Sequence, residues 1–142
     1  MAFGKFRFGN GNKFHNKKVV YDGIQFDSVL EKDRYVFLKL MERKGIVTDI
    51  ERQVEYVIIP AQFVEEERVG KNGQKLKPLR RCVERETKYK ADFVYTYDGR
   101  TIIEDTKSEI TRKGKDYVMK RKLMRLQGNP IVEVFKSNEV IK

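Results

Sequence analysis

The sequence predicts a single α/β domain in which a mixed central sheet is flanked by helices. Two stretches, 28–44 and 115–127, place apolar residues at helical spacing. Short alternating or continuous apolar stretches lie between and after them. The predicted order is helix, three strands, helix, strand. A chain of 142 residues has room for one such core and little left for a second.

Residues 1–18 are expected to form a basic, flexible arm. The first 20 residues hold five Lys and Arg residues and no acid, and phenylalanines alternate with basic and small residues. Such a segment can follow phosphates and stack on bases. A solvated terminus, or an edge strand at Phe6–Phe8, is the open alternative.

The first elements of the domain at 19–142 are a hairpin and a helix. Asp22-Gly23 is a strong two-residue turn, so residues 19–26 predict a hairpin. The helix at 28–44 starts with a capping box, in which Glu31 is expected to bond the backbone of Ser28, and it ends at Gly45. The inward face of this helix is expected to hold Leu30, Phe37 and Met41, with Val29, Val36 and Leu40 beside them.

The middle of the chain predicts strands and an insertion. Residues 46–59 carry few charges after Glu55, so this strand is expected to be central in the sheet. The charged segment at about 62–87 has a turn signal at Asn72-Gly73 and is expected to protrude as an insertion.

Residues 88–97 and 100–107 predict two strands joined by the two-residue turn Asp98-Gly99. The numbers of directly opposite residues then have the same sum as those of the turn residues 98 and 99, which is 197. After a loop at 111–114, the second helix follows and a last strand covers 131–135. The inward face of the second helix is expected to hold Met119, Leu123 and Leu126.

Charge indicates the class of partner. Thirty-one Lys and Arg residues outweigh 21 Asp and Glu residues, which gives a formal net charge of +10. A basic domain of this size most often meets a polyanion, usually nucleic acid. A basic protein without such a partner is the open alternative. No apolar run is long enough for a transmembrane span or a signal peptide, so no membrane partner is expected.

The rarity of cysteine and histidine restricts the chemistry. Cys82 and His15 are the only residues of their types. This excludes an internal disulfide and multi-cysteine or histidine-rich zinc sites, and it argues against Ser–His or Cys–His catalysis. Any chemistry must be carried by carboxylates and lysines.

One group of carboxylates stands out on the two strands at 88–107. The register places Asp92 directly across from Asp105, and alternation puts Lys107 on the same face and Glu104 on the other. Like charges at such a short distance are unfavourable unless a cation lies between them. Mg²⁺ is the usual one, because it takes oxygen ligands from one or two carboxylates.

These residues resemble the PD-(D/E)xK nuclease motif, in which an acid ends one strand and an acid-any-lysine triplet lies on the next. Asp92 and Asp105-Thr106-Lys107 match it, with Ala91 in place of the proline, and Glu31 stands where many members carry a helix glutamate. The order of elements matches as well. The wider pattern is similar to a phage-encoded nuclease family grouped with Holliday junction resolvases and phage endonuclease I; it comprises Gly23-Ile24-Gln25-Phe26-Asp27-Ser28, Glu51-Arg52-Gln53-Val54, Ala91-Asp92-Phe93, Glu104-Asp105-Thr106-Lys107 and Lys120-Arg121-Lys122.

The resemblance covers about residues 20–136 and implies a restriction-endonuclease-like core and a metal-dependent DNA endonuclease. Asp92 and Asp105 would hold Mg²⁺, for which Mn²⁺ is expected to substitute. Glu31 would be a further ligand or a water-positioning base, and Lys107 would stabilise developing charge. The expected substrate is branched DNA such as a four-way junction, the expected assembly a homodimer, and the expected location the host cytoplasm, as for a phage protein.

Phosphate contacts are expected from the basic arm and the second helix. Residues 111–127 hold seven basic residues and one acid, a balance that favours contact with a polyanion. The expected DNA-binding residues are Lys5, Arg7, Lys13, Lys17, Lys18, Arg112, Lys113, Lys115, Lys120, Arg121 and Lys122.

Each candidate has a simpler interpretation that the sequence leaves open. Glu31 fits a capping box without any catalytic role. Asp92 could pair with a neighbouring lysine, and Glu104 could replace Asp105 as the acid. The chain as a whole could be a non-catalytic nucleic-acid-binding module, or a nuclease that acts on linear or flap DNA.

Overall fold

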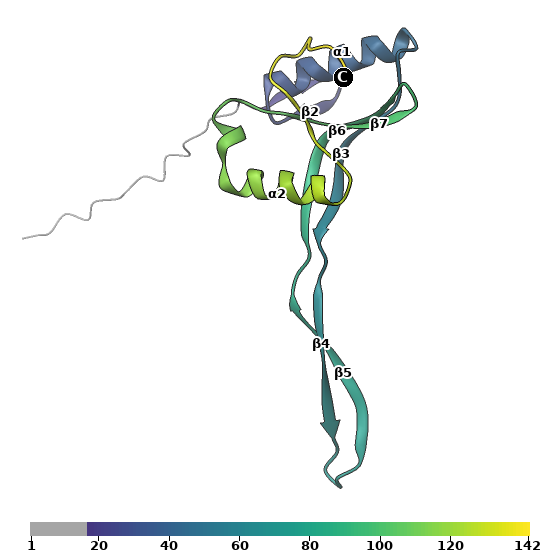
Figure 1. Cartoon of the computed structure of the whole chain (residues 1–142), viewed down its shortest axis with the longest axis vertical. Coiled ribbons are helices and arrows are strands. Elements are labelled where there is room, and N and C mark those ends of the chain that lie inside the picture. Colours follow the sequence, from purple (N-terminus) through teal and green to yellow (C-terminus); the bar gives the residue numbers. More distant parts are fainter. Residues whose placement is uncertain (1–16) are drawn as a thin grey trace, which may run out of the picture.

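The computed structural model describes residues 17–142, and its centre is a four-stranded sheet (Figure 1). The strand order is β3 (Val47–Ile59), β6 (Thr87–Tyr97), β7 (Arg100–Thr106) and β8 (Val132–Val134). Neighbouring strands are antiparallel except β7 and β8, which are parallel. The predicted α/β class with a mixed sheet is confirmed.

Two helices, α1 (Val29–Arg43) and α2 (Lys115–Leu126), cover opposite faces of the sheet. Successive residues of a strand point to opposite faces. On β7, Ile102 packs in one core cluster with Leu38 of α1, whereas Ile103 packs in a second cluster with Met124 of α2. The alternation along β7 therefore assigns even-numbered side chains to the α1 face and odd-numbered ones to the α2 face.

The two Asp-Gly turns form as predicted. β1 (Val19–Tyr21) pairs with β2 (Ile24–Phe26), and β6 pairs with β7. Both residues of each turn have positive φ, 52° and 70° at the first and 49° and 71° at the second, as the tight hairpin turn that suits twisted strands requires. The pairs on β6 and β7 run from Tyr97–Arg100 to Phe93–Glu104. Each sums to 197, so the predicted register is confirmed.

A two-stranded ribbon separates β3 from β6. It consists of β4 (Gln62–Val69) and β5 (Lys75–Glu84), which pair only with each other. Every residue of both strands is exposed, and the ribbon extends away from the sheet and the helices (Figure 1). The predicted hairpin tip at Asn72-Gly73 is confirmed, with φ of 74° at Gly73.

The prediction that the strand at 46–59 is central is wrong, because β3 lies at one edge of the sheet. The chain leaves β3 into the ribbon and returns as β6, which pairs with β3 on one side and with β7 on the other. No strand within residues 17–142 pairs along the remaining edge of β3.

The predicted inward faces of the helices are wrong in part. On α1, Val29, Val36 and Leu40 are exposed, and the buried positions are Glu31, Arg34 and Leu38. Charged side chains occupy this inner face because each finds a polar partner inside, as described below. On α2, Met119 and Leu126 are exposed, and the buried side chain is Met124, which packs beside the partly buried Leu123. On both helices, the face that contacts the sheet is therefore rotated about the helix axis from the face that was predicted.

Some predictions fall outside residues 17–142, among them the contacts of Lys5, Arg7 and Lys13 and most of the arm at 1–18. Lys17 and Lys18 are described and exposed. Across the described residues, no helix combines the length and the apolar character needed to cross a membrane.

Candidate active site

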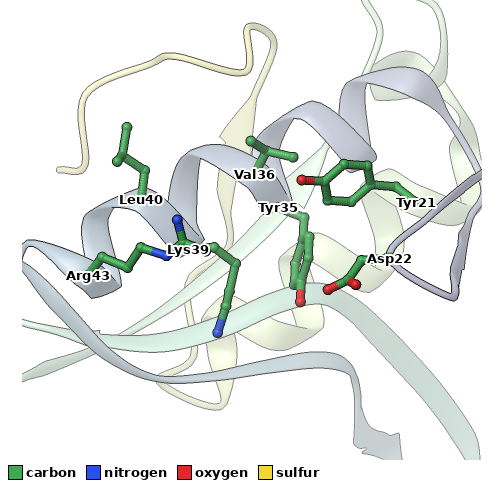
Figure 2. A pocket seen from close by; sticks show the side chains of 7 residues that line it. All are labelled: Tyr21, Asp22, Tyr35, Val36, Lys39, Leu40 and Arg43. Atoms are coloured by element: carbon green, nitrogen blue, oxygen red, sulfur yellow. The ribbon is translucent and has the colours of Figure 1, made fainter.

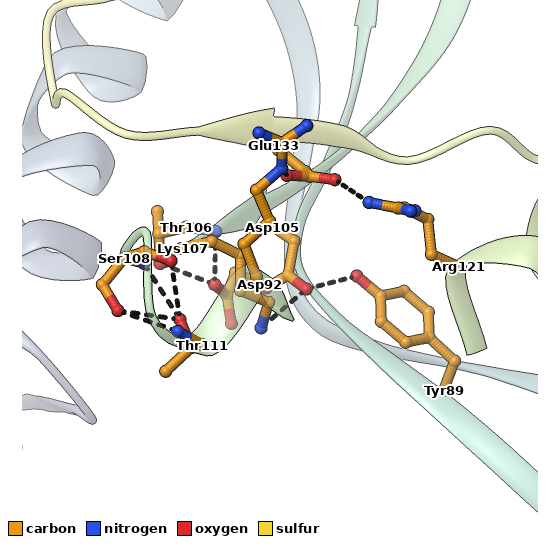
Figure 3. A network of polar contacts seen from close by, with 10 residues as sticks. Tyr89, Asp92, Asp105, Thr106, Lys107, Ser108, Thr111, Arg121 and Glu133 are labelled. Carbon is orange, nitrogen blue, oxygen red and sulfur yellow. Dashed lines mark hydrogen bonds and ion pairs between the residues drawn. The ribbon is translucent and has the colours of Figure 1, made fainter. Parts of the chain in front are cut away.

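Asp92 and Asp105 lie on adjacent strands, one step beyond the last backbone pair of β6 and β7. That pair is Phe93 with Glu104. Asp92 is held by Thr106, whose backbone N–H and hydroxyl both donate to Asp92 Oδ2, at 2.8 and 2.7 Å. This double hydrogen bond fixes the Asp92 carboxylate against β7, beside its predicted partner. Figure 3 shows the arrangement.

Asp105 is buried, at 2% exposure, and has two polar partners. The hydroxyl of Tyr89 donates to Asp105 Oδ2 at 2.8 Å, and Lys107 Nζ lies 2.9 Å from the same oxygen (Figure 3). Burial raises the pKa of Asp105 to about 7, the charge of Asp92 adds to the rise, and Lys107 opposes it. The repulsion between the two aspartates, predicted from the register, is therefore present in the fold.

Glu31 approaches this pair from the first turn of α1. Its Oε2 accepts from the backbone N–H of Asp27 at 2.9 Å, and Ser28 Oγ accepts from the backbone N–H of Glu31 at 3.1 Å. The capping box forms, but the backbone partner is Asp27 and not the predicted Ser28. Burial raises the pKa of Glu31, and the negative charge of Asp92 raises it further. Glu31 is thus both a helix cap and a third carboxylate coupled to Asp92.

Gln53 contacts Glu31 from the neighbouring strand β3. Its Nε2 donates to Glu31 Oε1 at 2.9 Å. On β3, Gln53 stands between the pairs Arg52–Phe93 and Val54–Ala91, which places it opposite Asp92. Its φ of 54° lies in the left-handed region, which is uncommon for a residue other than glycine. Such conformations are found where the surroundings enforce them, often at functional sites.

Lys107 is half-buried between acid and aromatic groups. Besides Asp105, its ammonium contacts the ring of Tyr117 on α2, 4.6 Å from the ring centroid. Asp92, in contrast, forms no ion pair with Lys107 or with Lys90 in the described part of the chain, so that simpler interpretation of Asp92 finds no support.

Glu104 belongs to the opposite face, as the alternation predicted. Its two carboxylate oxygens accept from Arg34, at 2.9 Å from Nε and 2.5 Å from Nη2, and the hydroxyl of Tyr95 donates to the same carboxylate. Arg34 also donates to the backbone carbonyls of Ser137 and Glu139. This network is buried in the core on the α1 side, so Glu104 does not serve as the acid beside Lys107.

The donor set at Asp92 and Asp105 fits a hard divalent cation. Two carboxylates lie together, and burial raises the pKa values of both Asp105 and Glu31. The negative charge of Asp92 adds to each rise, while Lys107 and Arg52 oppose it. Mg²⁺ is commonly held by only one or two carboxylates, with water and phosphate oxygens completing its shell. Within residues 17–142, however, no three Asp, Glu, His or Cys side chains lie close enough together to hold a metal on their own. The aspartate pair therefore fits, whereas Glu31 does not complete a group of three metal ligands with it among residues 17–142.

The predicted basic residues of α2 and of the 3-10 turn before it, Thr111–Lys113, are divided between two settings. Arg112 and Arg121 both pair with Glu133 of β8, at 2.8 and 2.9 Å. Arg121 and Lys122 line a pocket between α2 and β8. Three further predicted contacts lie along the same segment without lining that pocket: Lys113, Lys115 and Lys120.

Two residues of the site, Tyr89 and Tyr117, were not anticipated. Gln53 and Thr106 stood in the motif pattern, but no contact was predicted for either. No spacing rule connects Gln53 or Tyr89 to the acids, because their contacts depend on how β3 and β6 twist. The partner role of Thr106 follows from the register, since Thr106 is the next residue after the one opposite Asp92. A separate hollow of about 220 Å³ on the outer side of α1 is lined by none of the site residues (Figure 2).

The site and the sheet together define an α/β protein with a carboxylate–lysine centre on the α2 face. The chain belongs to a family whose model matches residues 11–139 and whose description reads "Protein of unknown function (DUF1064)". No curated protein and no solved structure matches the chain.

Proposed function

We propose that the protein is a metal-dependent phosphodiesterase that cleaves DNA. The observation that carries the proposal is the pairing of Asp92 with the buried Asp105, whose pKa is raised to about 7 and whose carboxylate contacts Lys107. A buried carboxylate beside a second carboxylate is unfavourable, and perturbed carboxylates of this kind are concentrated at functional sites. The similarity to the PD-(D/E)xK motif supports the same conclusion, and it extends the proposal to a restriction-endonuclease-like core.

Asp92 and Asp105 would hold Mg²⁺, which when bound would polarise the scissile phosphate and acidify a water molecule. Thr106 and Tyr89 fix the two carboxylates, because each donates a hydrogen bond that restricts rotation of the acid. A carboxylate that is pre-oriented in this way loses little entropy when it binds a cation.

Lys107 and Glu31 would act on the water and the phosphate. The Lys107 ammonium lies at the acid pair and would stabilise the negative charge that develops on the phosphate oxygens. Glu31, with its raised pKa, is suited to accept a proton from the attacking water or to orient it. Its Oε1 is held by Gln53, so the carboxylate is kept in a single orientation.

The proposed substrate is DNA. Residues 111–127, which include the site residue Tyr117, hold seven basic residues that can contact phosphates. Similarity to the resolvases favours branched DNA and a homodimer, since symmetric cuts need two sites. Action in the host cytoplasm would follow from that assignment. Hydrolysis of linear or flap DNA is the alternative within the same chemistry.

The test is a cleavage assay on matched four-way-junction, flap and linear duplex DNA, with Mg²⁺, with Mn²⁺ or with EDTA. The proposal predicts cleavage with either metal and none with EDTA. Cleavage that persists in EDTA would exclude the metal site. Binding without cleavage under every condition would favour a non-catalytic nucleic-acid-binding module.

A further inference from the structure

A second pocket lies next to the acid pair, between α2 and β8. It has a volume of about 380 Å³. Four basic side chains and one carboxylate line it, together with Pro130 and Ile131; they are Arg112, Arg121, Lys122, Arg125 and Glu133.

Glu133 is the single carboxylate of the pocket. It pairs with two of the four basic side chains and cannot neutralise all of them. Glu133 Oε2 lies 2.8 Å from Arg112 Nε, and Glu133 Oε1 lies 2.9 Å from Arg121 Nη1. Within residues 17–142, neither Lys122 nor Arg125 forms an ion pair with an acid. Four positive charges against one negative charge leave the pocket strongly positive, and the two guanidinium groups are pre-oriented.

The pocket and the acid pair share one face of the sheet. Glu133 on β8 is the direct neighbour of Asp105 on β7, and paired residues of adjacent strands point to the same side. Adjacent strands are about 4.8 Å apart. The ring of Tyr117 lies between the two places, since Lys107 Nζ is 4.6 Å and the Arg121 guanidinium carbon 6.0 Å from its centroid. The Tyr117 hydroxyl is buried and has no hydrogen-bond partner in the described chain.

We propose that this pocket binds a second phosphate of the same DNA strand, next to the phosphate held at Asp92 and Asp105. Guanidinium groups bind phosphate oxygens through paired hydrogen bonds, and two of them are already oriented here by Glu133. The inference rests on the proposed function for the position of the scissile phosphate, but the pocket's affinity for phosphate does not require cleavage.

The substrate class follows from this arrangement. A strand that fills both places carries at least one phosphodiester beyond the scissile one. Small diesters with a single phosphate would use only the acid pair and would bind weakly. The proposed site therefore selects polynucleotides over mononucleotide esters.

Binding is measured on the full chain in EDTA, with a fluorescent 20-base-pair duplex and a range of salt concentrations. The variant carries Lys122→Gln and Arg125→Gln, two exposed positions. Loss of one phosphate contact lowers the log–log slope of affinity against salt by about 0.9. The matched control carries Arg43→Gln and Lys44→Gln, which removes the same charge from the exposed end of α1. The control is expected to keep the wild-type slope, and circular dichroism verifies that both variants are folded.

A second arm locates the contact. The phosphates flanking the scissile bond are replaced one at a time by neutral methylphosphonates, and cleavage with Mg²⁺ is measured for wild type and for the double variant. One replacement is expected to slow wild-type cleavage tenfold or more and to have little further effect on the variant.

The results separate the two proposals. An unchanged salt slope in the double variant, or equal sensitivity of both proteins to every replacement, would overturn the pocket assignment even if cleavage is normal. A reduced slope in a protein that cleaves nothing would retain the phosphate pocket and overturn the proposed function.

Discussion

Asp92 faces Asp105 from the adjacent strand, and its charge adds to the rise that burial produces in the pKa of Asp105. The two side chains are held by different partners, Asp92 by Thr106 and Asp105 by Tyr89 and Lys107. Neither acid can turn away without losing a hydrogen bond. The fold thus keeps two negative charges together, and their response to metal, protons and substitution can be measured.

Neutralising either aspartate is expected to abolish cleavage and retain DNA binding. In Asp92→Asn or Asp105→Asn, the amide keeps an acceptor for Thr106 or Tyr89 but removes a charge that a cation needs. Binding is expected to be unchanged or tighter, because the lost charge also repels phosphate. Gel-based cleavage and fluorescence anisotropy test this. Full cleavage by either variant would remove that aspartate from the site.

The stability of the metal-free protein should decrease as pH rises from about 4 to about 7. The folded pKa of Asp105 lies above its unfolded value of 3.8. In this window the folded chain holds a proton that the unfolded chain has lost, so the free energy of unfolding falls with increasing pH. The raised pKa of Glu31 acts in the same direction.

The control for that pH dependence is Asp105→Asn, which cannot titrate at this position. We expect it to be more stable than the wild type above pH 7, by on the order of a few kcal/mol. The difference should shrink towards pH 4. Thermal melts in EDTA across this range measure it. Parallel curves for the two proteins would contradict the assignment of the titration to Asp105.

Glu31→Gln is expected to keep stability and to lose activity. The single carbonyl oxygen of glutamine can keep the capping contact with Asp27. Its NH2 group can donate to Gln53 once the Gln53 amide turns to present its oxygen, so the melting temperature should barely change. The charge is lost, and cleavage should fall at least tenfold, the lower end of the roughly 10²–10⁴ attributed to one acid–base group.

Ser28→Ala is the matched control, because it removes the other half of the capping box. It should cost about 1 kcal/mol of stability. Single-turnover cleavage should remain near normal at a temperature where the variant is folded. If Glu31→Gln cuts at the wild-type rate, Glu31 is a helix cap only and the metal site consists of Asp92 and Asp105.

Lys107→Ala is expected to reduce turnover with little effect on the salt dependence of DNA binding. The ammonium is engaged by Asp105 and Tyr117 and would act on the reacting phosphate, not on the backbone further along. Neutralising Lys120, Arg121 and Lys122 together should have the reverse effect, with a reduced salt slope. If Lys107→Ala reduced the salt slope and the triple variant reduced only turnover, the division of roles between chemistry and phosphate binding would be wrong.

Arg34→Met should destabilise the fold by about 3–5 kcal/mol, because it leaves Glu104 charged and unpaired in the core. The double variant Arg34→Met, Glu104→Gln should recover part of that loss, since no buried charge remains. Chemical denaturation measures both. A loss below about 1 kcal/mol in the single variant would mean that water reaches Glu104.

Local chemistry explains what the sequence could predict. The Asp-Gly turns require positive φ at two successive residues, and this alone fixed the β6–β7 register that pairs Asp92 with Asp105. Helical periodicity located both helices but misjudged their inner faces. Hydrophobicity ranks Arg34 as outward, yet Glu104, 70 residues further along, makes its burial favourable.

Long-range pairing explains what the sequence could not predict. The edge position of β3 depends on the path of the chain through the ribbon, and no local pattern encodes it. The left-handed backbone of Gln53 is likewise not predictable, since no turn signal precedes it. Gln53 on this strand donates to Glu31, so the part of the sheet that was hardest to predict lies at the candidate site.

The β4–β5 ribbon alters how this molecule behaves in solution. A compact chain of this length would have a radius of gyration of about 14 Å, whereas strands of 8 and 10 residues extend by about 26 and about 33 Å on their own. The elongated monomer must experience more hydrodynamic drag than a sphere of its mass. It will elute early from a sizing column and resemble a dimer there, so only a mass measured by light scattering or sedimentation equilibrium can count its subunits.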